Sequence, residues 1–232
     1  MSDVTLHLPG RFKAVVFDMD GLLLDTEPMW HDAERELLAR HGDVFSDEDR
    51  IASHGRALVD TAAAYAPRLG LPAEDIEHEI HEIMLAHYRS GAPLHAGAEA
   101  LVQGLRSHLP AAVASNTSGA LVREALEAVG FHHLDLVASG IDLGAPKPAP
   151  AVYLEACRLL GVAPEDAIAF EDSPMGIAAA KAAGMYAVGI PERPDVDLAA
   201  AGADLVLESL AQVSLGVGPA PGARGPRPPV TT

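Results

Sequence analysis

Residues 15–25 read VVFDMDGLLLD, a short apolar run that ends in two aspartates, Asp18 and Asp20, and a glycine. The valine-rich segment over residues 13–17 is typical of a strand that is buried on both faces of a sheet. Two carboxylates this close together repel each other, and burying either one without a partner is unfavourable by several kcal/mol. The motif therefore predicts a compensating charge at the end of the strand, and a divalent cation is the first candidate.

Helical and strand-like segments alternate along the chain after residue 93. Helices are predicted over residues 97–108, 119–129, 149–160 and 174–183, and each is followed by a strand, over residues 111–114, 134–138, 167–170 and 186–190. Gly130, Gly161 and Gly184 fall where glycine commonly ends a helix. This alternation implies right-handed crossovers, so the predicted fold class is α/β, with a parallel sheet covered by helices on both faces.

The segment between residues 28 and 89 has a different pattern. Ile76, Ile80, Ile83 and His87 follow one another at helical spacing, and residues 46–49 resemble a capping box. No strand-like run interrupts the segment, so we expect a helical insert of about sixty-five residues. The last seventeen residues, 216–232, contain five prolines and four glycines, and we expect them to form a disordered tail.

Composition narrows the classes of partner. The 232 residues carry a formal net charge of −17, which argues against binding to nucleic acid or to an anionic membrane surface. No apolar run is long enough to span a membrane, and residues 1–10 lack the basic and apolar regions of a signal peptide. The single cysteine, Cys157, excludes an internal disulfide. We therefore expect a soluble cytoplasmic protein, and a monomer.

Polar side chains follow several of the predicted strands. Asp18 and Asp20 come after the first strand. Ser115, Asn116 and Thr117 follow the second strand, and Glu171, Asp172 and Ser173 follow a later one. A lysine, Lys147, lies in a loop before a helix. Because ligands bind at the carboxyl ends of parallel strands, we expect all of these side chains to meet at one edge of the sheet.

These residue types can together transfer a phosphoryl group. Carboxylates bind Mg²⁺, which prefers oxygen ligands, and one carboxylate can attack phosphorus to form an acyl phosphate. A second carboxylate can protonate the leaving group and then deprotonate the hydrolytic water. Each element alone also has a structural explanation as a helix cap or a solvated loop, so the functional interpretation depends on the complete set.

The motifs FDMDGLLLDTEP, VASNTS, the lysine of APKPAP, and FEDSPMGIAAAKAAGM resemble the four motifs of the haloacid dehalogenase superfamily, closest to its β-phosphoglucomutase-like and sugar-phosphatase branch. The resemblance extends over residues 12–212. It implies a Rossmann-like core with an all-helical cap inserted after the first motif. The implied division is a core of residues 1–26 and 93–215, a cap of residues 27–92, and the tail.

The resemblance also implies roles for individual residues. Asp18 matches the nucleophile, and Asp20 matches the general acid/base, whose backbone carbonyl also binds Mg²⁺. Lys147 matches the lysine that orients the nucleophile and the phosphoryl group. The remaining motif positions imply phosphate binding by Ser115, with Asn116 beside it, a direct metal ligand in Asp172, and either a ligand or a holder of metal-bound water in Glu171.

Two residues of the predicted cap are candidates for contact with substrate. Arg56, in ASHGRAL, matches an element that approaches the substrate in relatives, but it could equally be a solvated arginine at a helix start. Trp30 could stack on a sugar face or pack the cap against the core.

The branches of the superfamily differ in activity. Asp20 excludes the dehalogenases, which lack an acid there, and argues against P-type ATPases, which carry threonine. Sugar-phosphate mutases carry a histidine about twelve residues after the nucleophile, where this chain has Trp30, and a cap lysine, whereas residues 26–92 contain no lysine.

The segment DTEPMW is instead similar to the DSEPLW of hexose-phosphate phosphatases such as 2-deoxyglucose-6-phosphatase. We therefore expect a Mg²⁺-dependent phosphatase that acts on a small phosphorylated metabolite, a sugar phosphate, through an aspartyl-phosphate on Asp18. A mutase is the alternative. A non-enzymatic receiver-like module is a remote one, because receivers place their acidic pair first in the chain.

Overall fold

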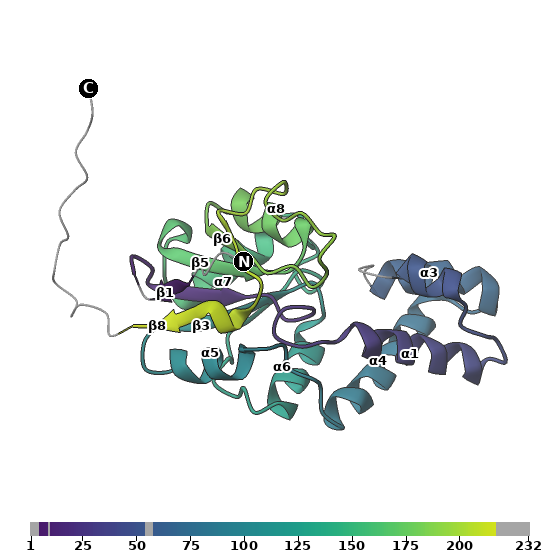
Figure 1. Ribbon diagram of the computed structural model, residues 1–232. Coiled ribbons are helices and arrows are strands. Elements are labelled where there is room, and N and C mark those ends of the chain that lie inside the picture. Colours follow the sequence, from purple (N-terminus) through teal and green to yellow (C-terminus); the bar gives the residue numbers. More distant parts are fainter. Residues whose placement is uncertain (1–4, 9, 54–57, 217–232) are drawn as a thin grey trace.

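A sheet of six parallel strands lies at the centre of the protein (Figure 1). The computed structural model describes residues 5–8, 10–53 and 58–216. In spatial order the strands are β4 (Val137–Ser139), β3 (Ala111–Ser115), β2 (Ala14–Phe17), β5 (Ala167–Glu171), β6 (Tyr186–Gly189) and β7 (Leu205–Val206). Every neighbouring pair is parallel, so the predicted α/β fold class is confirmed.

The strand order predicts a ligand site next to β2. The chain runs from β2 outward through β3 to β4 on one side, and then returns to form β5, β6 and β7 on the other side. The order of the strands therefore reverses at β2, which pairs with both β3 and β5. In open parallel sheets the crevice at the carboxyl ends beside such a reversal is where ligands bind.

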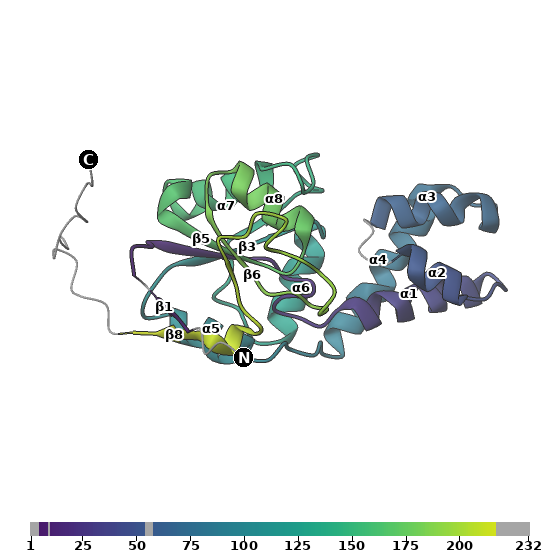
Figure 2. The same cartoon turned by 45° about the horizontal axis from the view of Figure 1, so that its top comes forward.

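The two faces of the sheet carry side chains of different size. Successive residues of β2 point to opposite faces, so that Val15 and Phe17 pack with α5 (Ala98–Leu105) and α6 (Gly119–Ala128). Figure 2 shows α7 (Ala151–Leu160) and α8 (Pro174–Ala182) on one side of the sheet and α5 on the other. The face under α7 and α8 is lined mostly by small residues, which let these helices pack close: Ala14, Val16, Ala112, Ala114, Ala167, Ala169 and Ala187.

Between β2 and α5 the described residues form four helices beside the sheet (Figures 1 and 2), and we refer to residues 27–89 as the helical insertion. They are α1 (Glu27–Arg40), α2 (Asp47–Ser53), α3 (Leu58–Leu69) and α4 (Ala73–Arg89). The predicted capping box of α2 is confirmed, because the Ser46 hydroxyl accepts from the Asp49 backbone at 3.1 Å and the Asp49 carboxylate accepts from the Ser46 backbone at 2.8 Å. The division into core and cap domains stays a prediction.

The buried face of α4 differs by one residue from the predicted one. Its buried side chains are Ile76, Ile80, Ile83, Met84 and Tyr88. The prediction that His87 continues this face is wrong: its ring is partly exposed and lies 3.6 Å from the Glu36 carboxylate. The apolar row continues through Met84 to Tyr88, four residues further on, and this brings a tyrosine hydroxyl to the active-site side of the helix.

Three strands were not expected from the sequence. β1 (Leu6–Leu8) and β8 (Val213–Leu215) form a separate two-stranded parallel sheet beside α5, and β7 extends the main sheet. The predicted helices and the other strands are observed within three residues of their expected ends. Residues 217–232, most of the predicted tail, lie outside the described part of the chain. None of the helices in the described part of the chain combines the length and the apolar character of a membrane-spanning segment.

Candidate active site

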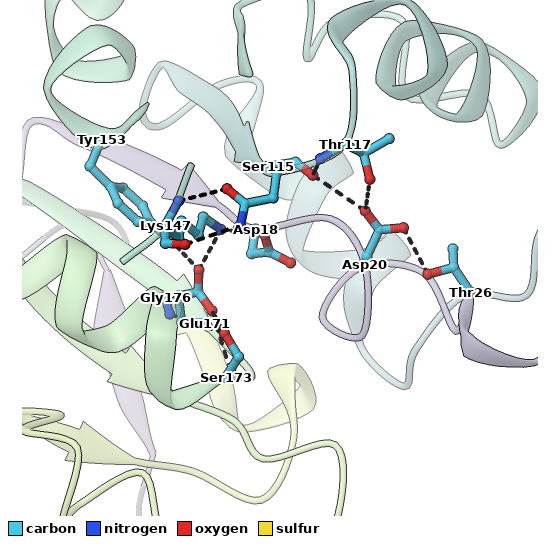
Figure 3. A network of polar contacts seen from close by, with 11 residues as sticks. Asp18, Asp20, Thr26, Ser115, Thr117, Lys147, Tyr153, Glu171, Ser173 and Gly176 are labelled. Atoms are coloured by element: carbon cyan, nitrogen blue, oxygen red, sulfur yellow. Dashed lines mark hydrogen bonds and ion pairs between the residues drawn. The ribbon is translucent and has the colours of Figure 1, made fainter. Parts of the chain in front are cut away.

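Asp18 lies directly after β2, at the point where the strand order reverses. Its side chain is buried, and its Oδ1 accepts a hydrogen bond from Nζ of Lys147 at 2.5 Å (Figure 3). Burial raises the pKa of Asp18 well above its ordinary value; Lys147 opposes this shift, and Glu171 and Asp20 add to it. A buried carboxyl in this setting keeps its charge only with help from cations, which is the situation predicted from the sequence motif.

Lys147 is held between two carboxylates. Besides the bond to Asp18, its Nζ donates to Glu171 Oε1 at 2.6 Å. Burial alone would lower the pKa of Lys147, but Asp18 and Glu171 outweigh burial and the net shift is upward. The ammonium group is therefore charged at neutral pH and lies beside Asp18, where it can also bind a phosphoryl oxygen.

Glu171 has no exposed surface, and its carboxylate is fully occupied by protein donors. Oε1 also accepts from the hydroxyl of Tyr153 at 2.5 Å, and Oε2 accepts from the hydroxyl of Ser173 at 3.0 Å. Burial, followed by the charge of Glu171, raises the pKa of Tyr153 well above its ordinary value, so Tyr153 remains a donor. Glu171 does not line the cavity described below, and its contacts fix the position of Lys147.

Asn116 contacts the backbone of the lysine loop. Its Oδ1 accepts from the Lys147 N–H at 2.8 Å, and its Nδ2 donates to the Lys147 carbonyl at 3.4 Å. A Cβ added to Gly140 would lie 2.6 Å from Asn116 Oδ1, so a glycine there leaves room for this clamp. Asn116, which the sequence motif associates with phosphate binding, thus positions Lys147. The side chain of Ser115 beside it points toward Asp20.

Asp20 accepts hydrogen bonds on both carboxylate oxygens, and its donors come from both sides of the cavity. Oδ2 accepts from Thr117 at 2.8 Å and from Ser115 at 3.3 Å, both after β3. Oδ1 accepts from Thr26 Oγ1 at 2.8 Å, Tyr88 Oη at 3.3 Å and Trp30 Nε1 at 3.5 Å. Asp20 is therefore the point at which α1 and α4 of the insertion meet the end of the sheet.

Asp172 faces the loop that follows β2. A Cβ added to Gly21 would lie 2.4 Å from Asp172 Oδ2, and the φ of Gly21 is +81°, so a side chain is excluded there both by space and by backbone conformation. Burial, followed by Asp18 and Glu171, raises the pKa of Asp172 well above its ordinary value. The negative charges of Asp18 and Asp172 destabilise each other, and a divalent cation between them would offset this. Carboxylate and carbonyl oxygens are the ligands that a hard cation such as Mg²⁺ prefers.

A cavity of about 460 Å³ lies between this site and the helical insertion. Trp30, one of the predicted substrate contacts, lines it and also packs partly against the core. The other, Arg56, lies outside the described residues. The remaining predicted site residues that line the cavity are Asp18, Asp20, Ser115, Asn116, Lys147 and Asp172.

Sequence reasoning missed three donors of the site, namely Thr26, Tyr88 and Tyr153, whereas Thr117 was expected at this edge of the sheet. Thr26 stands inside a quoted motif, so its position was a usable signal. Tyr88 and Tyr153 lie at apolar positions of α4 and α7, where the pattern predicts only packing. Ser173 also caps the N-terminus of α8, because its hydroxyl accepts from the Gly176 N–H at 3.1 Å.

A phosphate-handling hydrolase is the class that this fold and these side chains define. The family model for haloacid dehalogenase-like hydrolases matches residues 12–184, and the chain therefore belongs to this family.

Two relatives and one solved structure show how far the similarity extends. The validoxylamine A 7'-phosphate phosphatase of Streptomyces hygroscopicus subsp. limoneus is 32% identical over 208 residues, which cover 87% of this chain and 96% of that protein. The fructose-1-phosphate phosphatase YqaB of Escherichia coli (strain K12) is 31% identical over 188 residues, which cover 78% and 97%. The crystal structure of CbbY from Rhodobacter sphaeroides in complex with phosphate gives a TM-score of 0.77 at 32% identity and covers 86% of this chain and 95% of that chain.

Proposed function

We propose that the protein is a Mg²⁺-dependent phosphatase that hydrolyses the phosphate ester of a small metabolite, a sugar phosphate, through an aspartyl-phosphate on Asp18. The observation that carries the proposal is the arrangement of Asp18 and Asp20 in one cavity, with Lys147 bonded to the first and hydroxyl donors to the second. The substrates named for the two phosphatase relatives, validoxylamine A 7'-phosphate and fructose-1-phosphate, support this substrate class.

Hydrolysis requires two steps at this site. The Asp18 carboxylate attacks phosphorus, the bond from phosphorus to the ester oxygen breaks, and Asp20 gives its proton to the departing oxygen. Asp20 then removes a proton from a water molecule that attacks the same phosphorus, which releases inorganic phosphate and restores Asp18. Lys147 and Ser115 bind the phosphoryl oxygens during both steps, and the donors around Asp20 hold it in position.

The residues that would hold Mg²⁺ are Asp18, Asp172 and the backbone carbonyl of Asp20. When bound, the ion neutralises negative charge on the phosphoryl group and on the carboxylates that face it. The contacts of Glu171 with Lys147, Tyr153 and Ser173 support a role in positioning the lysine rather than direct metal binding.

A sugar-phosphate mutase is the second candidate, since it uses the same nucleophile and acid. The insertion argues for hydrolysis: Trp30 occupies the position of the mutase histidine, and its indole donates to Asp20 rather than presenting a base there. No lysine stands in residues 26–92 to bind a second phosphate.

A phosphate-release assay over sugar and polyol monophosphates, with product analysis, separates the two functions. A phosphatase releases inorganic phosphate with Mg²⁺, loses activity in EDTA and regains it when Mg²⁺ is restored, whereas a mutase moves the phosphate without release. Asp18→Asn abolishes release, and Asp47→Asn on the exposed surface of α2 is the matched control that leaves it unchanged. Normal release by the Asp18→Asn variant would rule out the covalent mechanism.

A further inference from the structure

Asp25, the last acid of the motif VVFDMDGLLLD, takes no part in the proposed phosphoryl transfer. It lies where the chain leaves the sheet for the helical insertion, and His95 lies where the chain returns from it. The two crossings pair in antiparallel fashion. The Asp25 N–H donates to the Pro93 carbonyl at 3.0 Å. The His95 N–H donates to the Leu23 carbonyl, also at 3.0 Å. Diagonal neighbours across such a pair are within reach of each other's side chains, so this pairing brings Asp25 and His95 together.

Glu192, in the loop after β6, completes a group of three side chains that can bind a metal ion. A ring nitrogen of His95 and one carboxylate oxygen each of Asp25 and Glu192 lie within 4.8 Å of one another. All three side chains are half-buried. Of these three described residues, only Glu192 lines the cavity of the candidate active site. The group therefore lies at the edge of the cavity and not among the phosphoryl-transfer residues.

The imidazole of His95 gives an independent indication of a ligand. Its Nε2 is buried and has no hydrogen-bond partner in the part of the chain that the structure describes. Buried polar atoms almost always have a partner, because an unpaired one destabilises the folded protein. Neutral imidazole is the commonest metal ligand among side chains, so a metal ion is a partner that this ring can accept.

The residue types in the group indicate which metal ion fits. Imidazole nitrogen suits Zn²⁺ and related ions, whereas Mg²⁺ prefers an octahedral set of oxygen atoms. Zn²⁺ binds histidine and carboxylate together in four-coordinate sites, where water can complete a set of three protein ligands. Ligand atoms around a tetrahedral zinc ion lie about 3.4 Å apart, so atoms now within 4.8 Å need to approach by at most about 1.4 Å.

Glu192 also has another interaction in the protein. A carboxylate has two oxygens and about four acceptor positions, so Glu192 can bind a cation with one oxygen and keep a further contact. Asp25 and His95, on the paired crossings, supply the other two ligands.

We infer that Asp25, His95 and Glu192 form a binding site for a divalent cation of the Zn²⁺ type, separate from the proposed Mg²⁺ site. The bound ion ties both crossings of the chain to the loop after β6, because each of these three segments supplies one ligand. The ion therefore stabilises the folded protein and restricts the crossings. The inference does not depend on the proposed phosphatase function.

The test must separate this site from the proposed Mg²⁺ site, which is a neighbour. Glu192 Oε2 and Asp172 Oδ2 lie 3.5 Å and 2.4 Å from the position that a Cβ of Gly21 would take. Zn²⁺ is therefore titrated calorimetrically into the protein with Mg²⁺ in excess. The wild-type protein and Asp18→Asn, which lacks a ligand of the proposed Mg²⁺ site, should bind Zn²⁺ with similar affinity.

Variants of the three ligands should lose affinity. Asp25→Asn and His95→Asn should each weaken Zn²⁺ binding at least about tenfold, since even the loss of a residue that only supports a metal ligand has an effect of this size. Glu192→Gln takes the place of either variant if that variant does not fold. The matched control is His132→Asn, which removes an exposed histidine bonded to Glu127 and should leave the affinity unchanged.

Hydrogen exchange and thermal unfolding locate the bound ion. The N–H groups of Asp25 and His95 form hydrogen bonds between the two crossings, so Zn²⁺ should slow their exchange in the wild-type protein and not in Asp25→Asn. Zn²⁺ should also raise the unfolding midpoint of the wild-type protein and of His132→Asn, but not of the ligand variants.

Three results would overturn the site. They are the absence of Zn²⁺ binding by the wild-type protein, wild-type affinity in the ligand variants, and protection from exchange that is confined to other segments. Loss of Zn²⁺ binding in Asp18→Asn would assign the ion to the phosphoryl-transfer residues and would overturn the site as well. None of these results bears on phosphate release, which tests the proposed phosphatase separately.

Discussion

Gly176→Ala should inactivate the protein although Gly176 makes no contact with the cavity. Gly176 lies in the first turn of α8, against the buried carboxylate of Glu171. An added Cβ would lie 1.8 Å from the Glu171 carboxyl carbon and about as close to both of its oxygens. That carbon must therefore move by about 1.6 Å to reach ordinary contact at 3.4 Å.

The displacement of Glu171 should lower both kcat and the free energy of unfolding. Glu171 cannot move so far and keep its bonds to Lys147, Tyr153 and Ser173. A misplacement of about 1 Å at a catalytic group lowers activity by about 10²-fold, so we expect kcat to fall at least that far. Alanine in a helix would otherwise stabilise the protein by about 1 kcal/mol, but overpacking costs about 1–3 kcal/mol, so the net free energy of unfolding falls.

Phosphate release and urea unfolding of the same preparations measure the two effects. Gly104→Ala in α5 is the matched control: its Cβ would meet only the Leu215 side-chain tip, which can move, so activity should persist. Wild-type kcat in a stably folded Gly176→Ala protein would refute the conclusion that a fixed Glu171 positions Lys147.

Three further changes test neighbouring contacts. Tyr153→Phe removes the 2.5 Å bond to Glu171 and should lower the free energy of unfolding by about 1–2 kcal/mol in urea titrations, with kcat reduced; an unchanged stability contradicts the bond. Asn116→Ala frees the Lys147 loop and should lower kcat with little change in KM, whereas a direct phosphate ligand would mainly raise KM. Burial raises the pKa of the Cys157 thiol to about 11 and leaves it almost no exposed surface, so at pH 8 iodoacetamide should label the folded protein far more slowly than the urea-unfolded protein.

The strands that carry the acids could be predicted because their sequence pattern is local. β2 and the first four residues of β5 are continuous apolar runs, and a polar residue directly after such a run must lie at the carboxyl end of the sheet. β1 and β8 could not be predicted in this way. Each has three residues, and Leu6 pairs with Val213 across almost the whole chain, so no local pattern specifies the pairing.

The contacts that orient the site depend on packing between elements, which one sequence does not specify. The apolar pattern of α7 predicts only packing for Tyr153, and its ring is buried, but the way α7 packs over the sheet also brings its hydroxyl to Glu171. The position of Tyr88 depends in the same way on the rotation of α4 about its axis. Because the sequence pattern assigned His87 instead of Tyr88 to the buried face of α4, the contact of Tyr88 with Asp20 was not predicted.

The pair Glu171 and Asp172 shows why neighbours in a motif can have different tasks. The sequence leaves open whether Glu171 binds the metal directly or holds metal-bound water, because a motif gives the order of the residues and not the direction of their side chains. Successive residues at the end of an extended strand point to opposite sides. Glu171 therefore points under α7 and α8, where Tyr153 and Gly176 surround it, while Asp172 points to the loop at Gly21 and lines the cavity. The alternation that divides the core residues of the sheet into two faces thus also divides this acidic pair: Glu171 accepts from Lys147, and Asp172 lines the cavity.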